Sequence, residues 1–129
     1  MFGALIIYFF PIDNLSVKFA KVLQILKNVE GKKIVASSYK TAITLLFNYL
    51  VNGIEENKLV MGSIYTYTGG MNLLEKQAAL EEFRNDSTDA VLLMTKQSGG
   101  LGLTITEANT VVLIEDDWNR EYLFLFLII

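Results

Sequence analysis

Apolar side chains recur at helical spacing near the start of the chain and predict an amphipathic helix over Val17–Asn28. Ser16 precedes this run and is predicted to cap the helix, because a serine hydroxyl accepts a backbone N–H of the first turn. Gly31 follows the run and is predicted to end it, since glycine commonly stops helices. The residues of the apolar face, at i, i+3, i+4 and i+7, are Phe19, Val22, Leu23 and Leu26.

Two more helices are predicted further along the chain. The first ends near Asn52-Gly53, where the apolar pattern stops. The second begins at Asn72, with Glu75 three residues later as in a capping box, and runs to about Arg84. Their apolar residues are Ala42, Leu45, Leu46, Tyr49 and Leu50 in the first helix, and Leu80 and Phe83 in the second.

Short β-branched, aromatic or continuously apolar runs separate these helices and predict strands. Glycine pairs and clusters follow two of the runs, at Gly69-Gly70 and at Gly99–Gly102, and predict turns there. The predicted strands are Ile34–Ala36, Ser63–Tyr67, Ala90–Thr95 and Thr110–Ile114.

The alternation of helices and strands predicts an α/β fold, a parallel sheet with helices on both faces. The continuous apolar strands agree, because parallel strands are buried on both sides. Ligands of such sheets bind at the carboxyl ends of the strands. The segments to search for function are therefore Ser37–Lys40, Thr68–Gly70, Thr95–Gly102 and Glu115–Asn119.

Two apolar runs of seven residues, Ala4–Phe10 and Leu123–Ile129, lie outside this pattern. Neither reaches the roughly 20 residues that a membrane-spanning helix needs. The first run has no positive residue before it and no cleavage pattern after it, which argues against a signal peptide. Two interpretations stay open for both runs: buried strands, or damaged or artificial boundaries. No targeting segment indicates a localisation.

The 129 residues include no cysteine and no histidine. Disulfides, Cys/His zinc sites, Ser-His-Asp triads and histidine acid–base steps are therefore excluded. A hydrophobic content of 52% and a mean hydropathy of +0.37 exclude disorder. The net charge is −3, with +3 in residues 1–64 and −6 in residues 65–129. Because the overall field does not attract polyanions, any such contact is expected to be local.

The glycine-rich stretch Thr95–Gly102 (TKQSGGLG) is the strongest candidate for chemistry. Its glycines let the backbone approach a ligand closely, and consecutive amides can form an anion-binding nest. Lys96 and the hydroxyls of Thr95, Ser98 and Thr104 are suited to phosphate contacts. The alternative is a tight strand-to-helix connection without a ligand. The stretch matches neither the P-loop nor the dinucleotide fingerprint.

Two other strand ends carry polar clusters with open interpretations. Glu115-Asp116-Asp117 offers carboxylates for a divalent metal, as in receiver domains, or for a general base, and is otherwise a solvated strand end. Ser37–Lys40 offers hydroxyls, helix amides and an ammonium for phosphate. The alternative for that segment is a cluster that caps the following helix.

Taken together and in order, these strand ends resemble the C-terminal lobe of Swi/Snf-type superfamily 2 helicases over roughly residues 16–119. The glycine-rich stretch looks like motif V of that branch, and the following strand with Asp-Trp-Asn continues the match without a gap. The matching stretches are Lys33–Tyr39 (KIVASSY), Tyr67–Gly70 (YTGG), Glu75-Lys76, Phe83, Val91–Thr104 (VLLMTKQSGGLGLT), Ala108–Ile114 (ANTVVLI) and Asp117-Trp118-Asn119.

The resemblance implies a RecA-like second lobe of a DNA-dependent ATPase, incomplete at its C-terminal end. In this family two lobes clamp ATP and grip nucleic acid across their shared face. The first lobe carries the phosphate-binding loop, the Mg²⁺ carboxylates and the catalytic base. The implied partners are DNA and a first RecA-like lobe, in cis or in trans. ATP and Mg²⁺ belong to the intact enzyme, and tight binding to this chain alone is not expected.

By position, the resemblance assigns residues of this chain to two surfaces. It assigns no catalytic and no metal-binding residue. The nucleic-acid contacts would be Ser37, Ser38, Tyr39, Lys40, Thr68, Gly69, Thr95 and Lys96, and the motif V side of the nucleotide cleft would be Ser98, Gly99, Gly100 and Gly102.

The sequence also departs from the family pattern. Lys76 stands where arginine is usual, Arg120 stands where proline is usual, and residues 121–129 contain neither Gln nor Arg. The arginine-finger motif, which contributes about 10³–10⁵-fold in related NTPases, is therefore not found here. Three segments are expected: an apolar leader (1–15), a partial helicase C-terminal lobe (16–119) and an apolar tail (120–129).

The sequence thus predicts a partial second lobe of a Swi/Snf-type ATP-dependent DNA helicase or translocase that is inactive as an isolated chain. One alternative is a non-catalytic nucleic-acid-binding module or a decayed gene fragment. Another is a receiver- or flavodoxin-like domain that binds a metal through the carboxylates of 115–117.

Overall fold

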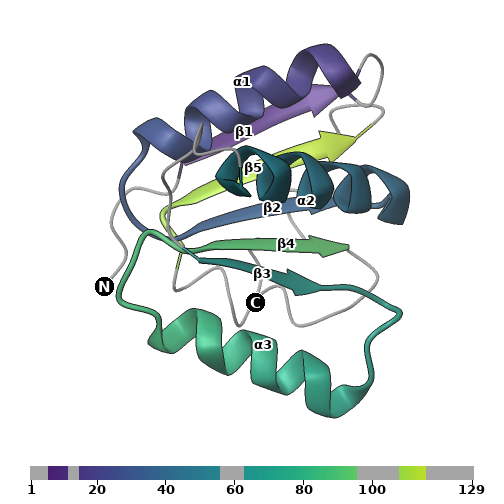
Figure 1. Cartoon of the computed structure of the whole chain (residues 1–129), viewed down its shortest axis with the longest axis vertical. Helices are drawn as coiled ribbons and strands as arrows, with labels where there is room; N and C mark the ends of the chain where they lie inside the picture. Colours follow the sequence, from purple (N-terminus) through teal and green to yellow (C-terminus); the bar gives the residue numbers. More distant parts are fainter. Residues whose placement is uncertain (1–5, 12–14, 56–62, 96–107, 116–129) are drawn as a thin grey trace.

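The computed structural model describes residues 6–11, 15–55, 63–95 and 108–115. Within these ranges strands and helices alternate along the chain (Figure 1). The strands are β1 (Ile6–Pro11), β2 (Lys33–Ser37), β3 (Ile64–Tyr67), β4 (Val91–Thr95) and β5 (Thr110–Glu115), and the helices are α1 (Leu15–Asn28), α2 (Lys40–Glu55) and α3 (Leu73–Asn85).

The five described strands form one parallel sheet in the order β1-β5-β2-β4-β3. The prediction of a parallel sheet is confirmed. A flavodoxin- or receiver-like sheet has the order 2-1-3-4-5, with its last strand at an edge. Here β5, the last described strand, lies between β1 and β2. The receiver- or flavodoxin-like alternative is therefore wrong.

Helices cover both faces of the sheet, as predicted. Figure 1 shows α1 and α2 on one face and α3 on the other. The chain moves across the sheet in one direction from β1 to β3 and turns back from β3 to β4. Crossovers of a single hand then require α3 to lie opposite α1 and α2, as observed.

The strands bury alternate side chains against the two helical layers, because successive residues of a strand face opposite sides. Phe83 of α3 is fully buried on its side of the sheet, and Val22 of α1 on the other. The strand residues on the α3 side are Ile34, Ala36, Tyr67, Leu92, Met94, Val111 and Leu113, and those on the α1–α2 side are Val35, Val91, Leu93, Val112 and Ile114.

The predicted ends of α3 and the predicted end of α1 at Asn28 are confirmed, whereas the predicted start of α1 and the predicted end of α2 are less accurate. The Asn72 side chain accepts the Glu75 N–H at 2.8 Å, and the Glu75 carboxylate accepts the Asn72 N–H at 3.1 Å, so the capping box is confirmed. Helix α1 begins at Leu15, so Ser16 lies inside it and the predicted cap is wrong. Helix α2 continues through Gly53, because one glycine near a helix end costs only about 1 kcal/mol.

The N-terminal apolar run forms the edge strand β1, so for residues 6–11 the strand interpretation holds. Its register pairs Ile6 with Thr110 and Pro11 with Glu115 along β5. Pro11 ends the strand at the sheet edge, where a missing N–H is tolerated. The second run, Leu123–Ile129, lies outside the described residues. None of the helices described is both long and apolar enough to cross a membrane.

Candidate nucleic-acid interface

The carboxyl edge of the sheet brings three predicted segments together. The register pairs Ser37 of β2 with Thr95 of β4, and Tyr67 of β3 with Met94 of β4. Thr68, one residue past Tyr67, therefore lies level with Thr95. Hydroxyl-bearing residues thus end three adjacent strands, and sequence alone could not give this alignment because it depends on strand order.

Ser37 shapes the connection between β2 and α2. Its side chain is buried, and its Oγ accepts the backbone N–H of Tyr39 at 3.0 Å. The Tyr39 carbonyl accepts the N–H of Ile43 at 3.3 Å, so Tyr39 occupies the cap position of α2. Ser38 is half-buried and Tyr39 is 40% exposed. Part of this segment therefore organises the helix start, while Tyr39 and Lys40 face outward at the edge.

The segment after β3 forms the predicted glycine turn. The Met71 N–H donates to the Thr68 carbonyl at 3.1 Å, and the Thr68 N–H lies 3.4 Å from the Met71 sulfur. Gly69 and Gly70 are exposed at the tip of this turn. A Cβ on Gly69 would meet no atom within 4 Å. The turn therefore offers open backbone to a ligand at the same edge as Ser37–Lys40.

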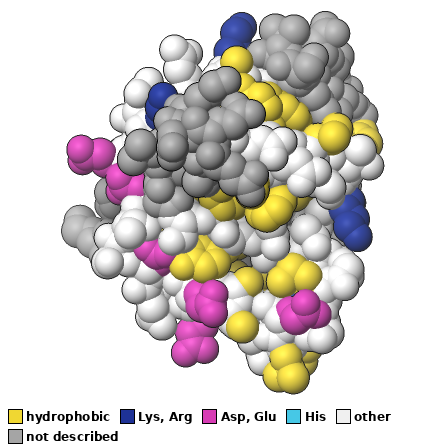
Figure 2. Space-filling model, viewed as in Figure 1, with side chains coloured by type: hydrophobic (Ala, Val, Ile, Leu, Met, Phe, Trp, Pro, Cys, Tyr) yellow, Lys and Arg dark blue, Asp and Glu magenta, His cyan; other side chains and the backbone are white. Residues whose placement is uncertain are grey.

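Lys40 joins these two segments in space. A Cβ built on Gly70 would lie 2.9 Å from the Lys40 Nζ and 3.9 Å from its Cε, so the ammonium rests against the glycine turn. Figure 2 shows one group of basic side chains at the edge to which the strand arrows of Figure 1 point and others at the top and upper left of this view, while acidic side chains lie over α3 and along the left side.

Lys76 belongs to the same end of the molecule. Its Nζ lies 5.4 Å from the centroid of the Tyr67 ring, within the range of a cation–π contact. Lys76 departs from the arginine usual in the family, yet it still places a cation over the last residue of β3. Sequence analysis identified Lys76 but missed its aromatic partner, because that contact joins β3 to α3.

Several predicted residues lie outside the described part of the chain. These are Lys96 and the motif V residues, as well as two of the three carboxylates proposed for a metal. Among the described residues, no group of three acidic side chains is placed to hold a metal ion. The predicted site residues outside the described ranges are Lys96, Ser98, Gly99, Gly100, Gly102, Thr104, Asp116 and Asp117.

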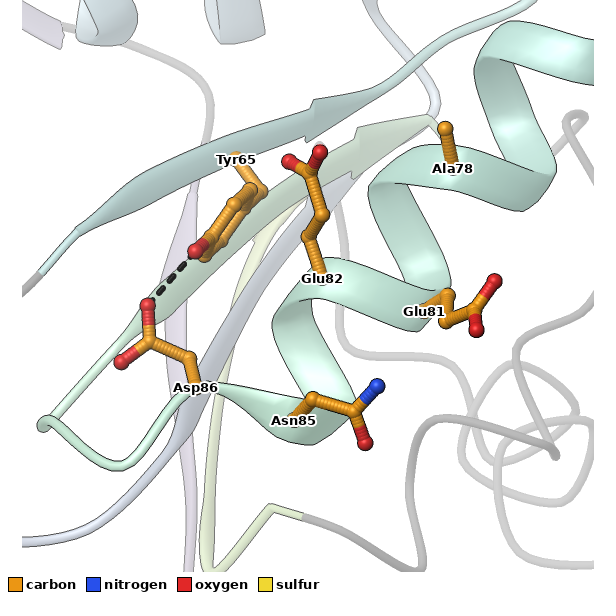
Figure 3. A pocket seen from close by; sticks show the side chains of 6 residues that line it. All are labelled: Tyr65, Ala78, Glu81, Glu82, Asn85 and Asp86. Atoms are coloured by element: carbon orange, nitrogen blue, oxygen red, sulfur yellow. Dashed lines mark hydrogen bonds between the residues drawn. The ribbon is translucent and has the colours of Figure 1, made fainter.

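A shallow hollow of about 540 Å³ lies between β3 and α3, away from the carboxyl edge (Figure 3). The Tyr65 hydroxyl donates to the Asp86 carboxylate at 2.6 Å, and the N–H and hydroxyl of Thr88 donate to the same carboxylate. Hydrogen bonds from Thr88 and Tyr65 hold the pKa of Asp86 well below its usual range. The bond to Asp86 in turn raises the pKa of Tyr65. These bonds fix the loop after α3.

The fold is that of a RecA-like domain, a parallel sheet covered by helices on both faces (Figure 1). The C-terminal domain of the DEAD-box protein Dbp5 superposes on this chain with a TM-score of 0.58, covering 95% of this chain and 83% of that domain. At 11% identity this similarity concerns the fold alone. It agrees with the parallel sheet and the two helical layers described above.

The sequence identifies the family. Residues 17–124 match the model of the helicase conserved C-terminal domain, and the chain belongs to this family. Similar proteins include helicase swr1 of Schizosaccharomyces pombe, 30% identical over 91 residues, and ATP-dependent helicase ULS1 of Saccharomyces cerevisiae, 29% identical over 109 residues. The chain is a C-terminal helicase lobe of the Swi/Snf type, as the sequence motifs predicted.

The chain spans a small part of these relatives. The alignments cover 70% of this chain and 7% of swr1, and 81% of this chain and 6% of ULS1. The TATA-binding protein-associated factor mot1 of Schizosaccharomyces pombe is 45% identical over 51 residues, which is 40% of this chain and 3% of mot1. The similarity therefore concerns one lobe of much longer proteins.

Proposed function

We propose that this chain is the second lobe of a Swi/Snf-type ATP-dependent DNA translocase and that its carboxyl edge contacts the DNA backbone. The observation that carries this proposal is the position of the Lys40 ammonium against the Gly69-Gly70 turn. The ammonium lies between the loops Ser37–Lys40 and Thr68–Gly70. The family resemblance assigns each of these loops, independently, to nucleic-acid contacts. Phosphates are the expected ligands, because cations, hydroxyls and backbone N–H groups bind them without reading sequence.

The proposed contacts divide the edge into a backbone-binding part and a nucleotide-facing part. Tyr39, Lys40 and Gly69 offer exposed groups to phosphates, Thr68 is half-buried beside them, and Ser37 holds the loop that presents Tyr39 and Lys40. Ser38, Thr95 and Lys96 complete the proposed DNA surface. The motif V residues Ser98, Gly99, Gly100 and Gly102 are proposed to line the nucleotide cleft against a first lobe.

ATP and Mg²⁺ are proposed for the intact two-lobed enzyme. The described residues of this chain offer no cluster of carboxylates for Mg²⁺. Following the family resemblance, we assign the metal ligands and the catalytic base to the first lobe, and we assign this lobe the role of holding DNA while the two lobes close on the nucleotide.

Binding of labelled duplex DNA, followed by fluorescence anisotropy at several salt concentrations, tests the DNA contact. Lys40→Gln is expected to weaken binding by roughly fivefold, since an exposed ion pair contributes up to about 1 kcal/mol. It is also expected to reduce the slope of log K against log salt by about 1. Lys27→Gln, at the other end of the sheet in the last turn of α1, is the matched control. Equal effects of the two substitutions would contradict the proposal.

The purified chain is expected to release no phosphate from ATP above a buffer blank, with or without duplex DNA. The physical reason is that a single lobe lacks the groups of the opposite lobe that polarise the phosphates and hold the metal. A colorimetric phosphate assay checks this. DNA-stimulated hydrolysis that co-purifies with the chain and is lost in Lys40→Gln would overturn the assignment of catalysis to the first lobe.

A further inference from the structure

The end of the Lys40 side chain lies beside Gly70, in the space that a side chain on residue 70 would need. Lys40 is the first residue of α2, and Gly70 lies in the turn between β3 and α3. Any side chain on Gly70 would place its Cβ 2.9 Å from the Lys40 Nζ, closer than such contacts normally allow. The ammonium can therefore occupy this position only because residue 70 has no side chain.

Backbone conformation does not explain the glycine at this position. Among the described glycines, only Gly31 has a positive φ. Alanine at residue 70 would therefore fit the backbone and conflict only with the end of the Lys40 side chain. Among the described residues, no hydrogen bond or ion pair engages that ammonium, so its charge is available to a ligand.

We propose that Gly70 is a positioning residue for Lys40. By leaving room beside the turn, it lets one cation lie over both loops of the carboxyl edge, where a single DNA phosphate meets the ammonium and the turn together. The inference rests on the proposed function and deepens it. It assigns the phosphate contact to the pair Lys40 and Gly70 and not to the lysine alone.

Gly69 provides a matched control on the same turn. A Cβ on Gly69 meets nothing within 4 Å, and its φ is likewise outside the left-handed region. Gly69→Ala and Gly70→Ala therefore add the same methyl group to neighbouring exposed positions. Only the second substitution moves the Lys40 ammonium.

The test has two readouts. The lysines are reductively methylated with ¹³C, which keeps their charge, and the Lys40 resonance is assigned by its loss in Lys40→Arg. Gly70→Ala is expected to shift this resonance, whereas Gly69→Ala is not. Duplex-DNA binding by the same variants, unmethylated, is expected to weaken roughly fivefold in Gly70→Ala and to stay unchanged in Gly69→Ala. In a Lys40→Gln background Gly70→Ala is expected to have no further effect, because the two residues act as one unit.

The outcomes separate this inference from the proposed function. If Gly70→Ala matches Gly69→Ala in both resonance and affinity while Lys40→Gln still weakens binding, the positioning role is overturned and the DNA contact stands. If Gly70→Ala shifts the resonance but Lys40→Gln leaves the affinity unchanged, the positioning stands and the DNA contact is overturned. Thermal unfolding of both glycine variants checks that each is folded.

Discussion

Gly31 and Lys33 lie at the amino edge of the sheet, where α1 leads into β2. Helix α1 ends at Asn28, as predicted, and Gly31 follows it in the connection to β2. Gly31 adopts a φ of +93° and packs against Asn109, where a Cβ would lie 2.5 Å from the amide nitrogen. Its N–H donates to the Asp89 carboxylate at 2.8 Å. Glycine is needed here for a left-handed backbone and a close contact, and both depend on residues far away in sequence.

Lys33 is a second residue at this edge whose structural role depends on residues far away in sequence. It begins β2 and is fully buried, and its Nζ donates to the Gly31 carbonyl at 2.8 Å and to the Asp89 carbonyl at 3.4 Å. Burial lowers the pKa of Lys33, and the nearby Asp89 charge offsets this only in part. The burial of Lys33 was not predicted, because nothing in the local sequence distinguishes it from the half-buried Lys32 before it.

Lys33 gives the protein a specific pH dependence. The pKa of Lys33 in the folded state lies below its unfolded value of about 10.4. At a pH between these two pKa values, the unfolded chain therefore binds more protons than the folded chain does. The contribution of Lys33 to the free energy of unfolding therefore rises with pH in that window. Urea unfolding of the wild type and of Lys33→Met across alkaline pH is expected to show that rise only in the wild type. Parallel pH profiles for the two proteins would contradict it.

At the scale of elements, α3 is the helix whose start the sequence defines most completely. Both hydrogen bonds of its capping box are present, and its two buried residues, Leu80 and Phe83, are the apolar residues predicted for it. The first turn exposes Leu73 and Leu74, at 70% and 76% of their surface. Capping, and not burial, therefore fixes where this helix begins.

Asn72→Ala is expected to lower the free energy of unfolding by about 1 kcal/mol, because it leaves the Glu75 N–H without its side-chain acceptor. Chemical denaturation measures the change. Gln77→Ala, on the exposed surface of the same helix, is the control and is expected to be neutral within about 0.5 kcal/mol. A loss in the control as large as that in Asn72→Ala would show that the cap does not carry the effect.

At the scale of the whole molecule, stability is concentrated in the middle of the sheet. Strands β2 and β4 are buried at every residue, whereas β3 at one edge is mostly half-buried. β2 is also flanked on both sides, by β5 and β4. Local opening is expected to begin at the edges, since fewer apolar contacts hold them.

Native-state hydrogen exchange is expected to reflect this arrangement. Amides of Ile34, Val35, Leu92 and Leu93 should exchange most slowly, near the rate set by global unfolding, and amides of β3 should exchange faster. Amide-resolved exchange by NMR checks the order. Uniform protection across β2, β4 and β3 would show that the sheet opens as one unit.

The sequence by itself determined the elements and the family. Helical and strand periodicities identified most of the described elements, because buried faces need apolar residues at regular spacing. Short motifs at the strand ends identified the chain as a C-terminal helicase lobe. Local signals were weaker where tertiary contacts compete with them, as in the start of α1 and the passage of α2 through Gly53.

Only the tertiary structure decided which strand ends lie together. The order β1-β5-β2-β4-β3 aligns Ser37 with Thr95, pairs the N-terminal run with β5 and brings Lys40 against Gly70. These contacts join residues that are far apart in the chain. No local pattern encodes them, because they follow from the handedness of the crossovers and the packing of helices on two faces.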